Sequence, residues 1–230
     1  MARESKAAKS ARVLELLARL KAEYPDAHCE LDYRNAFELL AATILSAQCT
    51  DVRVNLVTPA LFARYPDAHA LAAAKQEEVE ELIRSTGFFR NKAASLQAMA
   101  ARVCEKYHGQ IPRPMSALTT LPGVGRKTAH VVRGNAFDQP GFTVDTHVSR
   151  LSQRLGWTTQ TDPVRIEYAL DALFPRKDRT MVSHRLIFHG RRCCFARKPA
   201  CGACPVARLC PSRDLGEQDP VRAEKMIKRP

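Results

Sequence analysis

The sequence has no uninterrupted apolar run that approaches the ~18 residues needed to span a bilayer. The basic start of the chain, Met1–Ser10, is not followed by the apolar stretch of a secretory signal. No segment alternates apolar and polar residues as a half-buried strand does, and no internal repeat or low-complexity linker is visible. These absences argue against a membrane protein, a secreted protein and a β-rich fold. We therefore expect a globular chain in the reducing cytoplasm.

Apolar residues recur instead at helical spacing, which predicts an all-α chain. Leu96 and Val103 belong to one such stripe. The segment from Phe37 to Ala47 is apolar on all sides, which is typical of a central buried helix. Asp51 follows it in a position to cap the next helix, and Asp162-Pro163 gives the N-cap and first residue of another.

Basic residues outnumber acidic ones, with 36 Lys and Arg against 24 Asp and Glu and a formal net charge of +12. The segment from Arg176 to Pro230 holds 14 of the basic residues and 5 of the acidic ones, and so nine of the twelve excess charges. Such a field favours an anionic partner: DNA, RNA or an anionic membrane. The basic residues form no long amphipathic stripe, which disfavours the membrane. A surface that is basic only for solubility is the plain alternative.

Eight cysteines in a reducing compartment favour metal binding over disulfides. Four of them are spaced Cys-x6-Cys-x2-Cys-x5-Cys within seventeen residues: Cys194, Cys201, Cys204 and Cys210. Thiolates that converge in this way suit zinc or an iron–sulfur cluster, and the spacing alone leaves both open. Cys193 is an adjacent fifth thiol without an assigned role. The remaining three are expected to be small apolar core residues: Cys29, Cys49 and Cys104.

A turn with two glycines stands between two predicted helices, in the segment Leu-Pro-Gly-Val-Gly-Arg-Lys-Thr-Ala from Leu121 to Ala129. Glycine permits a tight turn and the close approach of another backbone. The free N–H groups at the start of the second helix can bind a phosphate oxygen. Without that ligand, the same pattern describes a plain connection between helices.

Three polar residues are candidates for chemistry at this turn and elsewhere. Lys127 lies in the first turn of a helix, where the dipole favours the neutral amine that acts in Schiff-base reactions; an ordinary surface lysine is the alternative. Asp145 is placed to cap a helix that carries Leu151, and beside Lys127 it could also stabilise positive charge on a sugar. Gln48 could project from a polar loop toward DNA.

Taken in their order along the chain, these segments resemble the endonuclease III family of the helix-hairpin-helix (HhH-GPD) superfamily of DNA glycosylases. The similarity runs from about Leu31 to Cys210. It is strongest in residues 121–129, in residues 144–147, and in the cysteine run that follows His189-Gly190-Arg191.

The resemblance implies an all-α fold of two helical domains with a DNA-binding cleft between them. Residues 29–138 would form a six-helix domain that carries the helix-hairpin-helix motif at about 115–133. Residues 1–28 and 139–230 would form the second domain, with the cluster loop at 194–210. The four spaced cysteines would hold a [4Fe–4S] cluster, which we expect to be structural rather than catalytic.

The resemblance also implies roles for individual residues. Lys127 matches the nucleophile of the family and Asp145 its essential partner, and relatives that only remove a base lack the lysine. Gln48 matches a gap-filling glutamine, and Phe88 stands where the family has a second wedge residue. Cys49 and the bulk of Phe88 depart from the family pattern and leave the lesion preference open. The other residues expected to contact DNA are Gly123, Gly125, Arg126, His147, Arg197 and Lys198.

The reaction implied is removal of an oxidised pyrimidine from duplex DNA after the nucleotide is flipped out, followed by Schiff-base β-elimination 3′ to the lesion. The partner would be double-stranded DNA with oxidised pyrimidines or abasic sites. The protein would act as a monomer in a bacterial-type cytoplasm, associated with the nucleoid. One alternative is a glycosylase without lyase activity, which Lys127 disfavours. The other is a non-catalytic DNA-binding module with a structural zinc, which gives no reason for Lys127 and Asp145 together.

Overall fold

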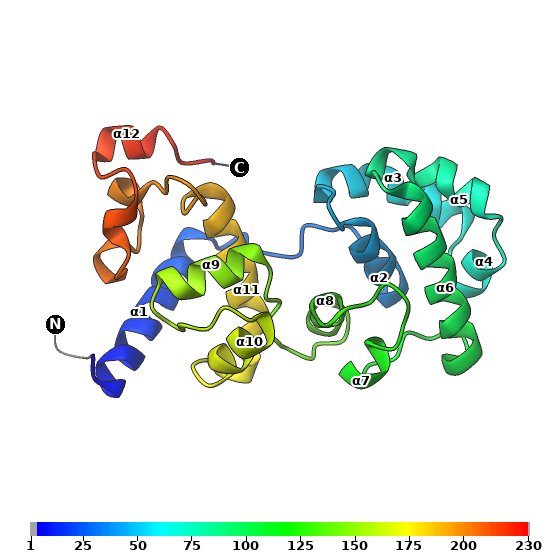
Figure 1. Cartoon of the computed structure of the whole chain (residues 1–230), viewed down its shortest axis with the longest axis horizontal. Helices are drawn as coiled ribbons and strands as arrows, with labels where there is room; N and C mark the ends of the chain where they lie inside the picture. Colours follow the sequence, from blue (N-terminus) through cyan, green and yellow to red (C-terminus); the bar gives the residue numbers. More distant parts are fainter. Residues whose placement is uncertain (1–3, 230) are drawn as a thin grey trace. The chain divides into compact units, whose positions relative to one another are not determined.

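The computed structural model describes residues 4–229. Residues 1–3 and 230, which the sequence assigns to the second domain, lie outside the described part. Every regular element within it is a helix, which confirms the all-α prediction (Figure 1). None of the described helices is long and apolar enough to cross a membrane. The chain divides into two compact units: residues 4–28 with 140–229, here the terminal unit, and residues 29–139, here the hairpin unit.

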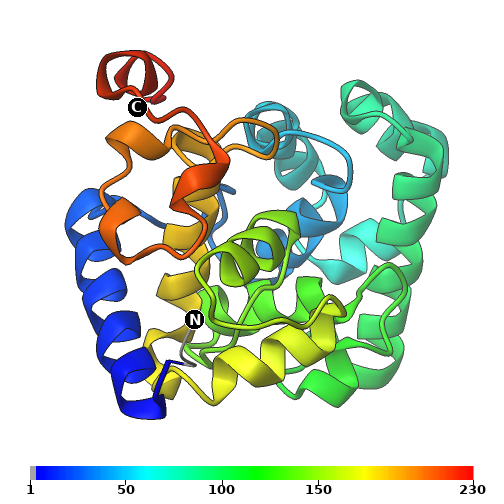
Figure 2. The same ribbon diagram turned by 60° about the vertical axis from the view of Figure 1, so that its left-hand side comes forward.

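The terminal unit combines both ends of the chain. Its α-helices are α1 (Lys6–Glu23), α9 (Thr146–Arg154), α10 (Pro163–Asp171), α11 (Arg179–Arg192) and α12 (Pro220–Glu224). Short 3-10 turns lie at η2 (Arg176–Asp178), η3 (Cys201–Ala203), η4 (Ala207–Leu209) and η5 (Arg213–Leu215). Helix α11 packs against α1 and α9, and Figure 2 shows blue α1 beside it. Leu16, Leu20, Leu151, Leu186 and Trp157 lie in the buried core.

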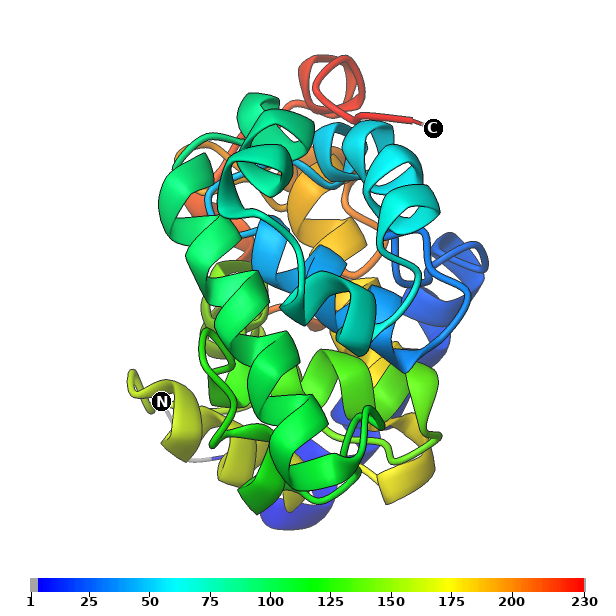
Figure 3. The ribbon, with the colours of Figure 1, turned by 90° about the vertical axis from the view of Figure 1, so that its right-hand side faces the viewer.

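The hairpin unit is one continuous stretch. Its α-helices are α2 (Ala36–Leu45), α3 (Asp51–Arg64), α4 (Ala68–Ala72), α5 (Gln76–Ile83), α6 (Phe89–Tyr107), α7 (Met115–Leu118) and α8 (Arg126–Ala136), with the 3-10 turn η1 (Arg84–Thr86). Residues Phe37–Leu45 of α2 are all buried, which confirms the prediction of a central apolar helix. Helix α6 packs against α4 and α5, as seen in Figure 3. Helix α2 also contacts α8, so the central helix supports the element that follows the two-glycine turn.

Side-chain caps fix where several helices begin. Asp162 caps α10 with Pro163 as its first residue, as predicted, and Asp145 caps α9. The cap predicted at Asp51 is wrong by one residue. Thr50 is the N-cap of α3, because its hydroxyl accepts the backbone N–H of Arg53 at 3.2 Å, and Asp51 is the first helical residue. A carboxylate in a first turn still stabilises the helix through the dipole.

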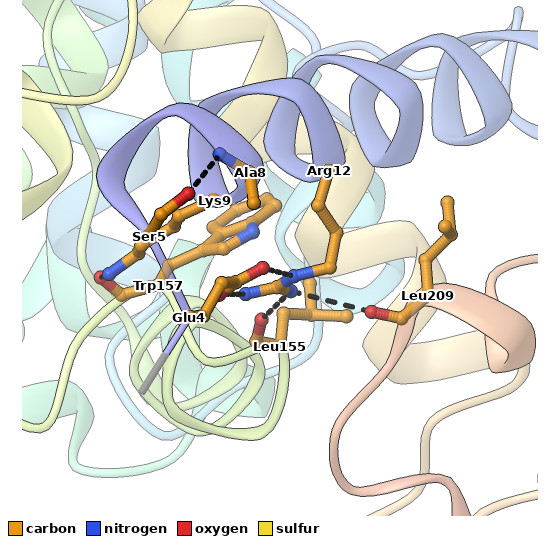
Figure 4. A network of polar contacts seen from close by, with 8 residues as sticks. All are labelled: Glu4, Ser5, Ala8, Lys9, Arg12, Leu155, Trp157 and Leu209. Carbon is orange, nitrogen blue, oxygen red and sulfur yellow. Dashed lines mark hydrogen bonds and ion pairs between the residues drawn. The ribbon is translucent and has the colours of Figure 1, made fainter. Parts of the chain in front are cut away.

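Helix α1 is fastened to the rest of the terminal unit by a polar network (Figure 4). Arg12 donates to the carbonyl of Leu155 at 2.7 Å and to that of Leu209 at 3.4 Å, and it pairs with Glu4. Lys9 donates to the carbonyl of Trp157 at 2.9 Å. Because Leu209 precedes Cys210, this network ties the first helix of the chain to the end of the cysteine loop.

Candidate functional site

The two-glycine turn adopts a helix-hairpin-helix geometry between α7 and α8. Gly123 has a φ of +74°, and a Cβ at this position would lie 3.3 Å from Cβ of Ser95 on α6. Gly125 is the N-cap of α8 with a φ of −86°, and no atom lies within 4 Å of the position where its Cβ would be. The fold therefore needs glycine at 123 for its own conformation. At 125 the missing side chain instead leaves the backbone of an exposed turn open to a ligand.

Lys127 and Asp145 belong to different units. Lys127 is the second residue of α8, as predicted, and its side chain is exposed two residues after Gly125. Arg126, between them, is partly buried. Asp145 is partly buried in the terminal unit, and its Oδ1 accepts the backbone N–H of Val148 at 2.8 Å. The carboxylate of Asp145 is thus held in a fixed rotamer by the helix that it caps.

The two residues predicted to enter the DNA stack both lie in the hairpin unit on left-handed turns. Gln48 follows α2 with a φ of 53°, and its side chain is exposed. Phe88 precedes α6 with a φ of 48° and is 65% exposed. Non-glycine residues rarely adopt this conformation. A large aromatic side chain that the surrounding fold leaves in solvent is available to a partner.

The four spaced cysteines line one pocket of the terminal unit. Leu151, Leu155 and Val206 form part of its apolar wall, and Cys193 lies in it as well. Burial raises the pKa of Cys194, Cys201 and Cys210, that of Cys210 to about 11, whereas a hydrogen bond from the Cys193 thiol lowers the pKa of Cys204. Four cysteine sulfurs that converge in an apolar pocket fit a thiolate-bound cluster.

Two arginines of α9 that the sequence did not predict as site residues reach the cysteine loop. Arg154 donates to Sγ of Cys194 at 3.3 Å and to the carbonyl of Phe195 at 2.7 Å. Arg150 donates to the carbonyl of Cys194 at 3.0 Å. They lie one helical turn apart on the helix that Asp145 caps. That spacing places both side chains on one face of α9, but no local pattern indicates that this face meets the cysteine loop.

His189 is a further neighbour of the thiols. Its Nε2 lies 3.6 Å from Sγ of Cys204, and its Nδ1 is 2.9 Å from the hydroxyl of Tyr24 on α1. The ligand atoms of His189, Cys193 and Cys204 lie within 4.8 Å of one another. Cys193 therefore lies close to Cys204, one of the predicted cluster ligands. It is 1% exposed and packs beside the predicted ligands.

The predicted DNA-contact residues of the terminal unit have different surroundings. Arg197 is exposed, whereas Nζ of Lys198 lies 2.7 Å from Oε2 of Glu217. His147 is partly buried, with its Nδ1 3.2 Å from Nη2 of Arg150. A Cβ on Gly190 would collide with this ring, so His147 has a packing role within the unit.

The C-terminal segment, residues 216–229, lies against the cysteine loop. The N–H of Glu217 donates to the carbonyl of Pro199 at 2.9 Å, and the N–H of Gly202 donates to the carbonyl of Glu217 at 2.7 Å. A Cβ on Gly216 would overlap the Pro199 carbonyl, so the two backbones approach as closely as glycine allows. Ala223 is fully buried in a small apolar cluster with Cys193 and Ala200. The segment is thus a strap over the cysteine loop.

Comparison with known proteins identifies the hairpin and the cysteine loop. Residues 41–176 match the family of HhH-GPD superfamily base excision DNA repair proteins, and residues 194–210, from Cys194 to Cys210, match the iron–sulfur binding domain of endonuclease III. The endonuclease III of Synechocystis sp. is 58% identical over 90% of this chain and 94% of its own length. That of Escherichia coli K12 is 39% identical over 87% of this chain and 95% of its own. The chain belongs to the endonuclease III family of the HhH-GPD superfamily.

Solved structures of the endonuclease III family have the same fold. A trapped endonuclease III–DNA covalent intermediate is 45% identical, with a TM-score of 0.84 over 89% of this chain and 97% of that one. A non-covalent endonuclease III–DNA complex gives the same identity and TM-score over 96% of its chain. The cofactor of the cysteine pocket is a [4Fe–4S] cluster, as the family resemblance implied.

Proposed function

We propose that this chain removes oxidised pyrimidines from duplex DNA and then cleaves the strand at the abasic site. It is a DNA glycosylase with AP-lyase activity in base excision repair. The observation that carries the proposal is the position of Lys127, exposed in the first turn of α8, directly after the hairpin turn. Endonuclease III, the relative with this fold, forms a covalent intermediate with DNA.

The residues of the hairpin unit prepare the substrate. The open backbone at Gly125 and the free N–H groups at the start of α8 bind phosphate oxygens, and Gly123 and Arg126 complete this contact. The target nucleotide leaves the duplex, because its sugar cannot be attacked within the stack. Gln48 and Phe88 then occupy the space in the stack, as wedge side chains do in other DNA complexes.

Lys127 carries the chemistry. Its neutral amine attacks C1′ of the flipped nucleotide, the C1′–N bond breaks, and the base departs with its electron pair. Loss of a proton from nitrogen and opening of the sugar give the Schiff base. Removal of a 2′ proton then expels the 3′ phosphate by β-elimination. Asp145 accepts the proton of the amine or offsets positive charge on the sugar, because its N-cap bond holds the carboxylate in place.

The terminal unit contributes affinity and the cluster. Cys194, Cys201, Cys204 and Cys210 hold the [4Fe–4S] cluster, which would fold and stiffen the basic loop between the first two ligands. Arg197 and, when released from Glu217, Lys198 contact phosphates without reading sequence. We further propose that the protein acts as a monomer on the DNA of a bacterial nucleoid.

Borohydride trapping on a duplex with a single thymine glycol tests this function, with wild type and Lys127→Ala compared. We expect a covalent adduct and strand cleavage with wild type only. Base release without an adduct would instead identify a glycosylase that lacks lyase activity. DNA binding without release from any of several oxidised pyrimidines would contradict the proposed substrate.

A further inference from the structure

A lysine is buried in the hairpin unit next to the wedge turn. Lys92, on the first turns of α6, is only 6% exposed, and its Nζ donates to the carbonyl of Thr86 at 2.8 Å. Its backbone N–H donates to the carbonyl of Phe88 at 3.0 Å. The side chain of Lys92 is therefore bonded to the residue that precedes the Gly87–Phe88 turn, and its backbone is bonded to Phe88 itself. Burial of an ammonium group is costly without such a partner, and an apolar side chain would fill the same space more cheaply.

The turn that Lys92 holds is strained. Gly87 and Phe88 have φ values of 71° and 48°, and no side-chain cap stabilises the start of α6 at Phe88. A non-glycine residue in the left-handed region is strained and persists only when its surroundings fix it. The bond from Lys92 to Thr86 crosses this turn, and it therefore supplies such a constraint.

The same helix supports the hairpin turn. Ser95, one turn after Lys92, is the residue that Gly123 approaches most closely. Helix α6 is 19 residues long and packs against α4 and α5, so its first turns are fixed to a rigid body. The phosphate-binding turn and the Phe88 wedge are thus mounted on one helix, with Lys92 between them.

We propose that Lys92 is a positioning residue for nucleotide flipping. It holds Phe88 in place so that this side chain enters the stack while the hairpin turn keeps the phosphates in register. This inference rests on the proposed glycosylase function. Lys92 does not touch DNA itself, so its loss acts on flipping and leaves phosphate binding unchanged.

The test compares Lys92→Met with Lys106→Met, an exposed lysine on the same helix. Nucleotide flipping is monitored by the fluorescence of 2-aminopurine placed opposite a thymine glycol. Base release is measured under single-turnover conditions in quench experiments. We expect Lys92→Met to reduce the fluorescence change and to slow base release by about tenfold or more. Affinity for undamaged duplex and cleavage of a preformed abasic site should stay within about twofold, because an abasic nucleotide has no base to unstack. Lys106→Met should match wild type.

Two results would overturn the inference: unchanged flipping in Lys92→Met, or a parallel loss of duplex affinity and abasic-site cleavage. If Lys92→Met is unstable, a double-mutant cycle with Phe88→Ala tests the role of Lys92 in flipping. If Lys92 acts through Phe88, adding Lys92→Met to Phe88→Ala slows base release little further. Additive losses would contradict the proposal. If wild type releases no base, the proposed function is wrong, and the 2-aminopurine signal still tests Lys92.

Discussion

Nζ of Lys198 lies 2.7 Å from Oε2 of Glu217, so a lysine of the basic loop is paired within the protein before any DNA is bound. The carboxylate is only 9% exposed and also accepts from Arg222 and from the N–H of Asp219. These partners, with the Lys198 bond the largest, hold the pKa of Glu217 at about 2. Glu217 therefore stays charged at neutral pH, and in the proposed complex with DNA it competes with phosphate for Lys198.

Removal of that competing charge should strengthen the salt-sensitive part of DNA binding. We expect Glu217→Gln to raise affinity for duplex DNA at low salt, and to steepen the dependence of log Kd on log salt by up to ~0.9, the value for one phosphate contact. Salt titrations by fluorescence anisotropy measure both. Asp214→Asn, which removes the same charge at an exposed position of the neighbouring turn, is the control. Equal slopes in the two variants would show that Lys198 does not exchange partners.

Asp145 caps α9, and the proposed function gives it a second, separable role as a charged partner of Lys127. Asparagine caps helices as well as aspartate does, whereas alanine costs about 0.5–2 kcal/mol. We expect Asp145→Asn to unfold like wild type in urea and Asp145→Ala to be less stable. Both should slow single-turnover base release by about a hundredfold or more, because the carboxylate is lost in each. An asparagine variant with normal base release would assign Asp145 to capping alone.

Substitution by alanine should have different effects at the two hairpin glycines, lowering stability at Gly123 and DNA affinity at Gly125. Gly123→Ala places a Cβ at a φ of +74° and 3.3 Å from Ser95, so we expect it to lose about 1–2 kcal/mol of stability. Gly125→Ala meets no atom and has an ordinary φ, so at most about 1 kcal/mol should be lost through poorer capping. Its affinity for duplex DNA should nevertheless fall at least about fivefold, because the added methyl group stands where a phosphate approaches. Unaltered affinity in Gly125→Ala would place the phosphate elsewhere.

The strap formed by residues 216–229 should protect the cluster. Ala223 is fully buried beside Cys193, whereas Val221 on the same short helix is 66% exposed. Glutamate at 223 would bury an unpaired carboxylate, so we expect Ala223→Glu to displace the strap. Iron should then pass to a chelator several times faster, with loss of visible absorbance, while Val221→Glu behaves like wild type. Identical rates in the two variants would show that the strap does not guard the cluster.

The sequence predicts the parts of this protein that depend on local chemistry. The Asp162-Pro163 helix start, the Asp145 cap and the buried central helix follow from capping preference and apolar periodicity, which are properties of neighbouring residues. The choice between Thr50 and Asp51 as cap is a shift of one residue that local rules do not resolve. The contact of Arg154 with Cys194 and the pairing of Lys198 with Glu217 join distant segments, and no local pattern specifies them.

The division of the terminal unit between the two ends of the chain sets the order in which the protein can be completed during synthesis. Helix α1 leaves the ribosome before its partner α11, which lies more than 150 residues later in the chain. At about 5–20 residues per second, Leu16 and Leu20 wait roughly ten to thirty seconds for the surface that buries them. The hairpin unit is continuous and can fold during that interval. The cysteines are translated after it, and the strap that covers them is translated later still, so the cluster can be inserted only after the hairpin unit has been synthesised.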